Sequence, residues 1–353
     1  MGIWLGTRLL SLIAVVIVPC AVALLLVALL TPLDSWLRRL GIPRAIAAVL
    51  SVLVLLAVIV GIGVLTGFSV AGRFQELVDQ FSASINAVQQ RLAQLHLPID
   101  SDQVNQLIQR VQDSVMSAGQ GLTTTVVSAT EITLRFVVGL LLGLFVVIFL
   151  LWDGERVWDW LRGLFSAPTA DRLHEAGQAA WVAWTGFVHG TFIIACIHAV
   201  VIGSVLFFLG VPLYVPLALL VFLGSFIPLV GAFVAGAIAV IITLGTKGLV
   251  AAVIVLAALL IENELEAHVL QPFIVGRYVR LHPLAIILVL TLGTFLAGVA
   301  GALLAVPTTA ALRAAWGPIN GRPSAVPTVQ PSRLSRLWEW LRSRLQRPSA
   351  SDS

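Results

Sequence analysis

The feature that most constrains the fold is a run of apolar residues, 45–70, that contains no charged side chain. At about 1.5 Å per residue, a helix of this length crosses the ~30 Å hydrocarbon core of a bilayer. Hydrophobic residues make up 59% of the 353 residues and charged residues 11%, whereas a soluble domain is about half apolar and about a quarter charged. Because lipid offers no hydrogen bonds to the backbone, we predict an all-α, polytopic membrane protein.

Further apolar stretches follow along the chain and are interrupted by glycine and proline. We predict seven or eight membrane segments in total, from residues 9–31, 45–70, 132–151, 187–209, 212–228, 231–245, 248–261 and 284–312. Several are shorter than the ~20 residues of a full crossing, which is typical of broken or re-entrant helices around a transport site. Two alternatives stay open: residues 9–31 form one kinked span or a hairpin at Pro19, and residues 284–312 form one tilted span or a second hairpin. The predicted hinge or re-entrant turn residues are Pro228, Gly231, Gly298, Gly301 and Pro307.

The polar parts of the chain divide it into four regions. Residues 1–71 hold the first two membrane segments, joined by an arginine-containing loop at 32–44 that we expect in the cytoplasm. Residues 72–131 repeat apolar positions at heptad spacing and predict an extracytoplasmic helical hairpin, whose stripes pack on each other or form a subunit contact or gate. Residues 132–316 form the transport core, including a cytoplasmic amphipathic segment at 152–186. Residues 317–353 are a cytoplasmic linker and a basic amphipathic tail, which favours binding to anionic lipid.

Ionisable residues cluster between two long apolar segments, at residues 261–283. Charges next to bilayer-grade sequence are costly, so they mark either a functional site or a solvated cytoplasmic junction. Glu262 and Glu266 are four residues apart and share one helix face, while Glu264 and His268 share another. The candidate residues for transport or ion coupling are Glu262, Glu266, His268, Gln271, Pro272, Gly276, Arg277, His282 and Pro283.

Two histidines also lie in or beside an apolar helix, His189 and His198. A buried histidine of this kind is more often a hydrogen-bonded core residue than a proton relay, and the relay is the alternative. Neither histidine is counted among the candidate site residues.

The ionisable stretch at residues 261–283 resembles the signature of the AI-2E family of membrane transporters, named for export of autoinducer-2. The matching positions are Glu266, Gln271, Pro272, Gly276, Arg277, Leu281, His282 and Pro283, with Phe226, Ile227, Pro228 and Gly231 upstream and Gly293, Gly298, Gly301 and Ala305–Val306–Pro307 downstream. The chain departs from the family pattern at Ala267–His268 and at Ala232. The resemblance implies an inner-membrane permease and makes Glu266 the main coupling candidate.

Motifs for other functions are absent from the sequence. It contains no G-x-x-x-x-G-K-[ST], HExxH, GxSxG or CxxC, so we expect neither an ATPase nor another enzyme, and no catalytic residue, cofactor or metal. Its two cysteines, Cys20 and Cys196, lie in apolar segments, which argues against a disulfide framework. The net charge of +4 is not arranged as a nucleic-acid-binding surface.

We therefore expect a secondary-active permease that exports a small polar solute, similar to autoinducer-2, across the cytoplasmic membrane. Its partners would be that solute, a coupling ion (H⁺ or Na⁺), the bilayer and anionic lipid at the cytoplasmic C-terminal tail. One alternative is a monovalent cation (Na⁺ or Li⁺)/proton antiporter, and another is a membrane scaffold or sensor. The sequence leaves open the substrate, the transport direction, the coupling ion, the oligomeric state and the side of the N-terminus.

Overall fold

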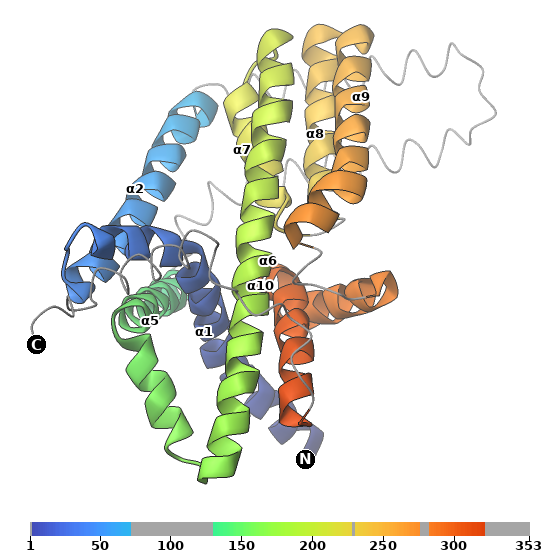
Figure 1. Ribbon diagram of the computed structural model, residues 1–353. Coiled ribbons are helices and arrows are strands. Elements are labelled where there is room, and N and C mark those ends of the chain that lie inside the picture. The colour runs from blue at the N-terminus through green and yellow to red at the C-terminus, as the bar shows by residue number, and fades with distance from the viewer. Residues whose placement is uncertain (1, 72–129, 228–229, 276–281, 322–353) are drawn as a thin grey trace, which may run out of the picture.

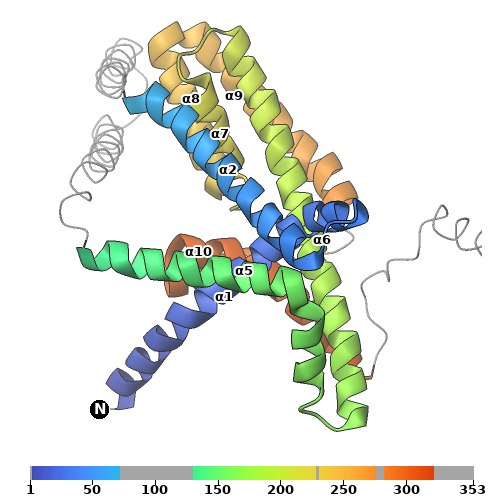
Figure 2. The same ribbon diagram turned by 90° about the vertical axis from the view of Figure 1, so that its left-hand side faces the viewer.

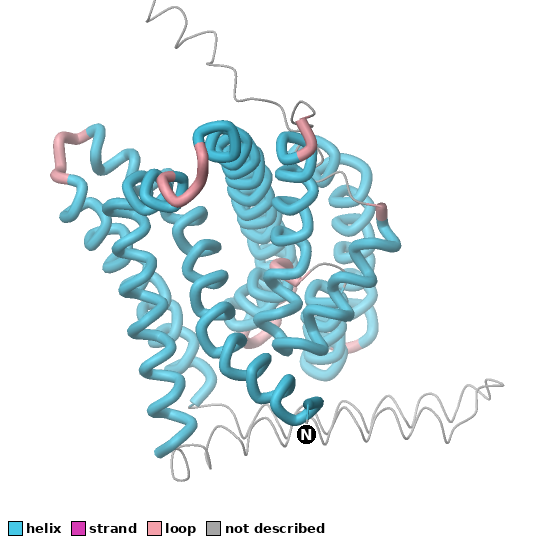
Figure 3. The backbone as a smooth tube through the Cα atoms, turned by 90° about the horizontal axis from the view of Figure 1, so that it is seen from below, coloured by secondary structure: helices cyan, strands magenta, loops and turns pink. Residues whose placement is uncertain are grey.

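The computed structural model describes residues 2–71, 130–227, 230–275 and 282–321, and no strand occurs in these ranges. The predicted hairpin at 72–131 and the tail at 317–353 lie almost wholly outside them. The helices in chain order are α1 (Gly2–Arg39), α2 (Arg44–Ala71), α5 (Thr130–Arg162), α6 (Ala167–Phe208), α7 (Tyr214–Gly224), α8 (Val230–Lys247), α9 (Leu249–Leu265), the π-helix η1 (Glu266–Val275) and α10 (Pro283–Ile319). The predicted all-α fold is confirmed, and the described loops between helices are short (Figure 3).

Helix α6 is the central axis and runs the height of the molecule (Figure 1). Around its C-terminal half, α7, α8 and α9 enclose a buried apolar cluster that includes Ile202 and Leu206 of α6 and Val255 of α9. Nearer its N-terminal end, α6 packs against α1 and α10 through Trp184 and Val188. Figure 2 shows α5 bending at its end to run beside the start of α6. The long helix therefore carries two separate groups of neighbours, one on each half.

Helix α1 passes through both of its prolines without ending. Residues 9–31 therefore form one helix rather than a hairpin at Pro19. The predicted loop at 32–44 is wrong over most of its length, because α1 continues to Arg39 and α2 starts at Arg44. An ion pair between Asp34 and Arg38, one turn apart, stabilises this last part of α1. The remaining turn uses Gly41 at φ 88°, a left-handed conformation that favours glycine.

Helix α6 also differs from the expected segment boundaries. It joins the second part of the predicted cytoplasmic segment at 152–186, from Ala167 on, to the predicted span at 187–209 in one 42-residue helix. No proline interrupts the chain between Pro168 and Pro212, so the change from charged to apolar composition does not stop the helix. Helix α5, in contrast, has non-helical backbone angles at Asp153, which produces its kink.

The predicted glycine and proline breaks are where the remaining helices end. The chain turns between α6 and α7 at Gly210, between α7 and α8 after Gly224, and between α8 and α9 at Gly248. Helix α10 is not one straight span, because Ala297 and Gly298 have non-helical angles and its two halves point in different directions (Figure 1).

Four helical segments in the described ranges are long and apolar enough to cross a membrane: Val18–Arg39, Arg44–Val64, Ala167–Phe208 and Leu284–Ile319. Helix α7 and the part of α8 from Phe233 to Lys247 are apolar but shorter. The chain is therefore a multi-pass helical membrane protein, and the count of seven or eight segments stays a prediction.

Candidate functional site

The candidate site lies where three segments of the chain meet: the C-terminal half of α6, the bend between α7 and α8, and the π-helix η1. His198 is on α6, in the middle of an apolar stretch, and its side chain is only 4% exposed. Its Nδ1 atom lies 3.0 Å from Ser225 Oγ, and its Nε2 atom lies 3.4 Å from Glu266 Oε2. A single buried imidazole thus links all three segments.

Ser225 is held in place by the bend that follows α7. A Cβ atom on Gly224 would lie 2.6 Å from the carbonyl oxygen of Gly231, and one on Gly231 would collide with the Gly224 carbonyl. Only glycines allow the two backbones to approach this closely. Ser225, the C-cap residue of α7, also donates a hydrogen bond from Oγ to the carbonyl of Val221 at 2.7 Å. The glycine contact therefore fixes the hydroxyl that faces His198.

Glu266 opens the π-helix that continues directly from α9. Its Oε1 atom accepts a hydrogen bond from Gln271 Nε2 at 3.1 Å. Side chains three or four residues apart are neighbours on an α-helix, whereas this pair is five apart and matches the i to i+5 repeat of a π-helix. Long π-helical stretches are rare and occur often at functional sites. We refer to His198, Ser225, Glu266 and Gln271 together as the His198 cluster.

A second carboxyl group adjoins the cluster. Glu262 lies one turn before Glu266, is 5% exposed, and has an Oε1 atom with no hydrogen-bond partner among the described residues. An unsatisfied buried acceptor is costly, so this atom is positioned to receive a donor from a ligand. Glu262 and Glu266 share a face, as their spacing predicts.

The other predicted site residues lie apart from the cluster or cannot be placed in it. His268 is exposed and pairs with Glu264 at 3.2 Å, on the second helix face that the spacing predicts. His282 is the N-cap of α10, where its Nδ1 atom accepts a hydrogen bond from the Leu284 amide. Pro272 lies in η1, and Pro283 is the first residue of α10. Gly276, Arg277 and Pro228 lie outside the described residues.

Among the predicted turn residues, Gly231 is next to the cluster, and three others belong to α10. Gly298 has φ 57° at the break in that helix, Gly301 is in close backbone contact with Gly293, and Pro307 is fully buried. Helix α10 thus repeats the tight glycine contact of the α7–α8 bend.

Two residues of the cluster are not among the sequence candidates. His198 is the buried histidine that we expected more readily in the role of a core residue, and its position within an apolar helix was the available signal. Ser225 follows Gly224 immediately before the Phe226–Gly231 motif, but a serine in an apolar segment carries little signal of its own. Their contact with Glu266 depends on the tertiary structure.

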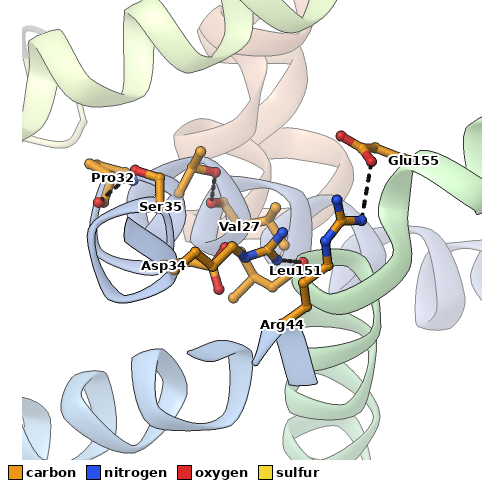
Figure 4. Close-up of polar contacts among 9 residues, drawn as sticks. Val27, Pro32, Asp34, Ser35, Arg44, Leu151 and Glu155 are labelled. Atoms are coloured by element: carbon orange, nitrogen blue, oxygen red, sulfur yellow. Dashed lines mark hydrogen bonds and ion pairs between the residues drawn. The ribbon is translucent and has the colours of Figure 1, made fainter. Parts of the chain in front are cut away.

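A second buried polar group joins α1 and α2 to α5 (Figure 4). Arg38 Nε lies 2.8 Å from Asp34 Oδ2, and Arg38 Nη2 donates a hydrogen bond to the carbonyl of Leu151. At its edge, Arg44 pairs with Glu155 at 3.5 Å, and both side chains are largely exposed. We refer to Asp34, Arg38, Leu151, Arg44 and Glu155 together as the Asp34 cluster. It holds the kinked end of α5 against the first two helices.

Comparisons with known proteins cover both clusters. A family model described as AI-2E family transporter matches residues 1–320. A candidate transport protein of Mycobacterium tuberculosis (strain CDC 1551 / Oshkosh), MT0215, is 38% identical over 300 residues, which is 84% of this chain and 81% of the relative. Two others, YrrI of Bacillus subtilis (strain 168) and YhhT of Escherichia coli (strain K12), are 26% and 24% identical over 316 and 304 residues. These alignments cover 85% and 83% of this chain, and 86% and 82% of the two relatives.

Proposed function

Since the chain belongs to the AI-2E family of membrane transporters, we propose that it is a secondary-active permease that exports a small polar solute, similar to autoinducer-2, across the cytoplasmic membrane. The observation that carries the proposal is the buried contact between His198 and Glu266. Ionisable groups inside a membrane protein are expensive to keep, and they commonly mark the path of a substrate or an ion.

The position of the contact supports a role in the transport cycle. His198 belongs to the long α6 helix, whereas Glu266 belongs to a π-helix and Ser225 to a tight bend. A change in the His198–Glu266 contact would therefore alter how the π-helix and the bend pack on α6. In alternating access, one part of a transporter moves against another, so contacts between separate segments must form in one state and break in the other.

Glu262 supplies the polar group for the solute. Its unpartnered Oε1 atom can accept a hydrogen bond from a hydroxyl group, and its burial limits competition from water. A small solute rich in hydroxyl groups is the class that such an acceptor favours. The sequence offers no nucleotide-binding loop, so an ion gradient is the energy source that we propose.

The orientation is part of the same proposal. We place the protein in the cytoplasmic membrane with its C-terminus in the cytoplasm, because the tail is rich in arginine. The tail would bind anionic lipid of the inner leaflet. We propose no enzymatic activity for the chain.

The proposal is tested with purified protein in sealed lipid vesicles. Uptake and efflux of a panel of small polar solutes are measured with no gradient, with a pH gradient and with a sodium gradient. We expect gradient-dependent solute movement that Glu266→Gln reduces by about tenfold and Glu264→Gln preserves. Glu264 is a matched control because it is two residues away and its side chain is 77% exposed. Wild-type transport by a well-folded Glu266→Gln protein would refute the assignment of the site.

The adjacent carboxyl groups of Glu262 and Glu266 favour one second candidate, the monovalent cation/proton antiporter. Sodium or lithium flux coupled to protons, without movement of any solute, would establish that function instead. The absence of all flux in verified, folded protein would favour a membrane scaffold or sensor.

A further inference from the structure

The position of one proton at Ser225 can be worked out from distances. Its Oγ atom lies 2.7 Å from the carbonyl oxygen of Val221, a separation typical of an O–H···O hydrogen bond. A carbonyl oxygen only accepts, so the single hydroxyl proton points at Val221. The hydroxyl oxygen can then only accept from His198 Nδ1, 3.0 Å away. The Nδ1 atom of His198 therefore carries a proton.

This assignment determines what His198 presents to Glu266. A neutral imidazole has one N–H group, so with Nδ1 protonated its Nε2 atom is a lone-pair acceptor. Nε2 lies 3.4 Å from Glu266 Oε2, and it has no hydrogen-bond partner among the described residues. An ionised carboxylate also offers only acceptors. A neutral His198 beside an ionised Glu266 would thus place two lone pairs against each other in a buried site.

We propose that the contact between His198 Nε2 and Glu266 Oε2 holds one exchangeable proton, and that this proton is the coupling ion of the permease. The proton makes His198 an imidazolium or Glu266 a carboxylic acid, and either form turns the contact into a donor–acceptor pair. Gln271 donates to Glu266 Oε1, so an acid proton belongs on Oε2, on the side of His198. The proposal rests on the proposed function, to which it adds the identity of the coupling ion.

The donor set favours a proton over an alkali cation. Sodium, a hard cation, prefers carboxylate, carbonyl and water oxygens, whereas imidazole nitrogen suits transition metals. At this contact one of the two facing atoms is a nitrogen. Within the described ranges, no group of three His, Cys, Asp or Glu side chains could hold a metal ion.

Among the described residues, one other titratable group faces the pair, the buried carboxyl of Glu262 on α9. The exposed Glu264–His268 pair uses another face of the same region. On α6, His189 bonds the Ala28 carbonyl, and Cys196 is half-buried. Charged residues on other helices packed against α6 contact other partners. Asp34 pairs with Arg38 on α1; on α5, Asp153 pairs with Arg156, Asp159 with Arg162, and Glu155 with Arg44 of α2. Lys247 of α8 lies near Gly210. In the described part of α7 there is no charged residue.

The bound proton can be tested without any transport. The full chain, labelled with ¹⁵N-histidine, is placed in vesicles of phosphatidylethanolamine and phosphatidylglycerol and studied by solid-state NMR at neutral pH. The chain has six histidines, and the His198 signals are those missing from His198→Gln. We expect both ring nitrogens of His198 to be protonated, or Nδ1 alone together with a carboxylic acid infrared band that is missing from Glu266→Gln. A neutral ring without that band would overturn the proposal.

The coupling role is tested in the same vesicles with a solute that the wild type moves. We expect a pH gradient to drive that solute and a sodium gradient of equal size to have no effect. The pH-gradient effect should fall by about tenfold in Glu266→Gln, within the range of typical coupling between sites, and stay unchanged in Glu264→Gln. If Glu266→Gln does not fold, His198→Gln replaces it, because its amide can still donate to Glu266.

The outcomes separate this proposal from the one on which it rests. Solute movement that is driven only by sodium would overturn the proton as coupling ion and leave the permease intact. A protonated pair in a protein that moves no solute would overturn both the coupling role and the permease, and leave only a bound proton.

Discussion

The His198 cluster and the Asp34 cluster are both buried polar groups that join separate helices, but they differ in where their protons come from. In the Asp34 cluster, the donor is the guanidinium of Arg38, which keeps its protons at any physiological pH. In the His198 cluster, the contact between His198 and Glu266 needs a proton that either residue can lose. One contact is therefore permanent, whereas the other is conditional.

This difference teaches how a helical membrane protein combines a rigid part with a movable one. The Asp34 cluster binds α1 to the kinked end of α5 through the Arg38 side chain and the Leu151 carbonyl, and α2 to it through the exposed Arg44–Glu155 pair. The His198 cluster binds α6 to a bend and a π-helix, through side chains alone. We expect changes in the first cluster to affect stability, and changes in the second to affect transport.

Loss of Arg38 should have the largest effect. Arg38→Ala would leave the carboxylate of Asp34, which is 8% exposed, without its counter-ion, and the Leu151 carbonyl without its donor. Removing one partner of a buried ion pair costs about 3–5 kcal/mol of stability. We expect a lower thermal unfolding midpoint in detergent micelles. Asp34→Leu combined with Arg38→Met should recover much of the loss, since it removes both charges. An unchanged midpoint in Arg38→Ala would show that the Asp34 cluster does not contribute to the stability of the fold.

Gly231→Ala should be the next most damaging change. Its Cβ atom would collide with the backbone carbonyl of Gly224, which cannot move like a flexible side chain. Overpacking of this kind costs about 1–3 kcal/mol, and the shift would also pull Ser225 away from His198. Both the unfolding midpoint and the transport rate should fall. Gly143→Ala is the control, because a Cβ there meets nothing within 4 Å in α5. Equal behaviour of the two variants would contradict the role of the glycine contact.

Glu266→Gln should lower transport but leave stability nearly unchanged, whereas Arg38→Ala in the Asp34 cluster should lower stability. The glutamine amide can donate to His198 Nε2 and accept from Gln271, so the packing is retained and the midpoint should shift little. The wild-type transport rate should depend on pH, whereas the variant should lose the exchangeable proton and show a flat pH profile. A loss of about tenfold in driven transport corresponds to about 1.4 kcal/mol. Retained pH dependence in the variant would place the titrating group elsewhere.

Glu155→Gln should have the smallest effect, although it also breaks an ion pair. Glu155 and Arg44 are 85% and 64% exposed at a distance of 3.5 Å. Exposed pairs contribute at most about 1 kcal/mol and often nothing measurable. The unfolding midpoint and the transport rate should both match the wild type. A large loss of stability would contradict this and show that the exposed Arg44–Glu155 pair also stabilises the packing of α2 on α5.

The sequence predicted the parts of the fold that depend on local chemistry. Breaks at Gly210 and Gly248 follow from residues that end helices, and the structure has its turns there. The long α6 was divided wrongly, because a change in composition at its middle does not stop a helix. The predicted end of the first segment at residue 31 was wrong for a similar reason, since α1 tolerates Pro32 and continues to Arg39.

The candidate site was predicted in part. Glu262, Glu266 and Gln271 lie together because they are near one another in sequence on one helical segment. Their contact with His198 joins residues far apart in the chain, and no periodicity predicts which apolar helix supplies the partner. Without an expected partner, a buried histidine was more simply explained as a core residue.

The π-helix at Glu266–Val275 has a consequence for protein engineering. Its hydrogen bonds join residues five apart in the chain instead of four, so the segment behaves as a helix with an inserted residue. Deleting Ala267 would allow an ordinary α-helix to form, but it would shorten the Glu266–Gln271 spacing and rotate everything that follows about the helix axis. A designer who aligns or shortens this protein should therefore preserve the length of the segment before its residue identities.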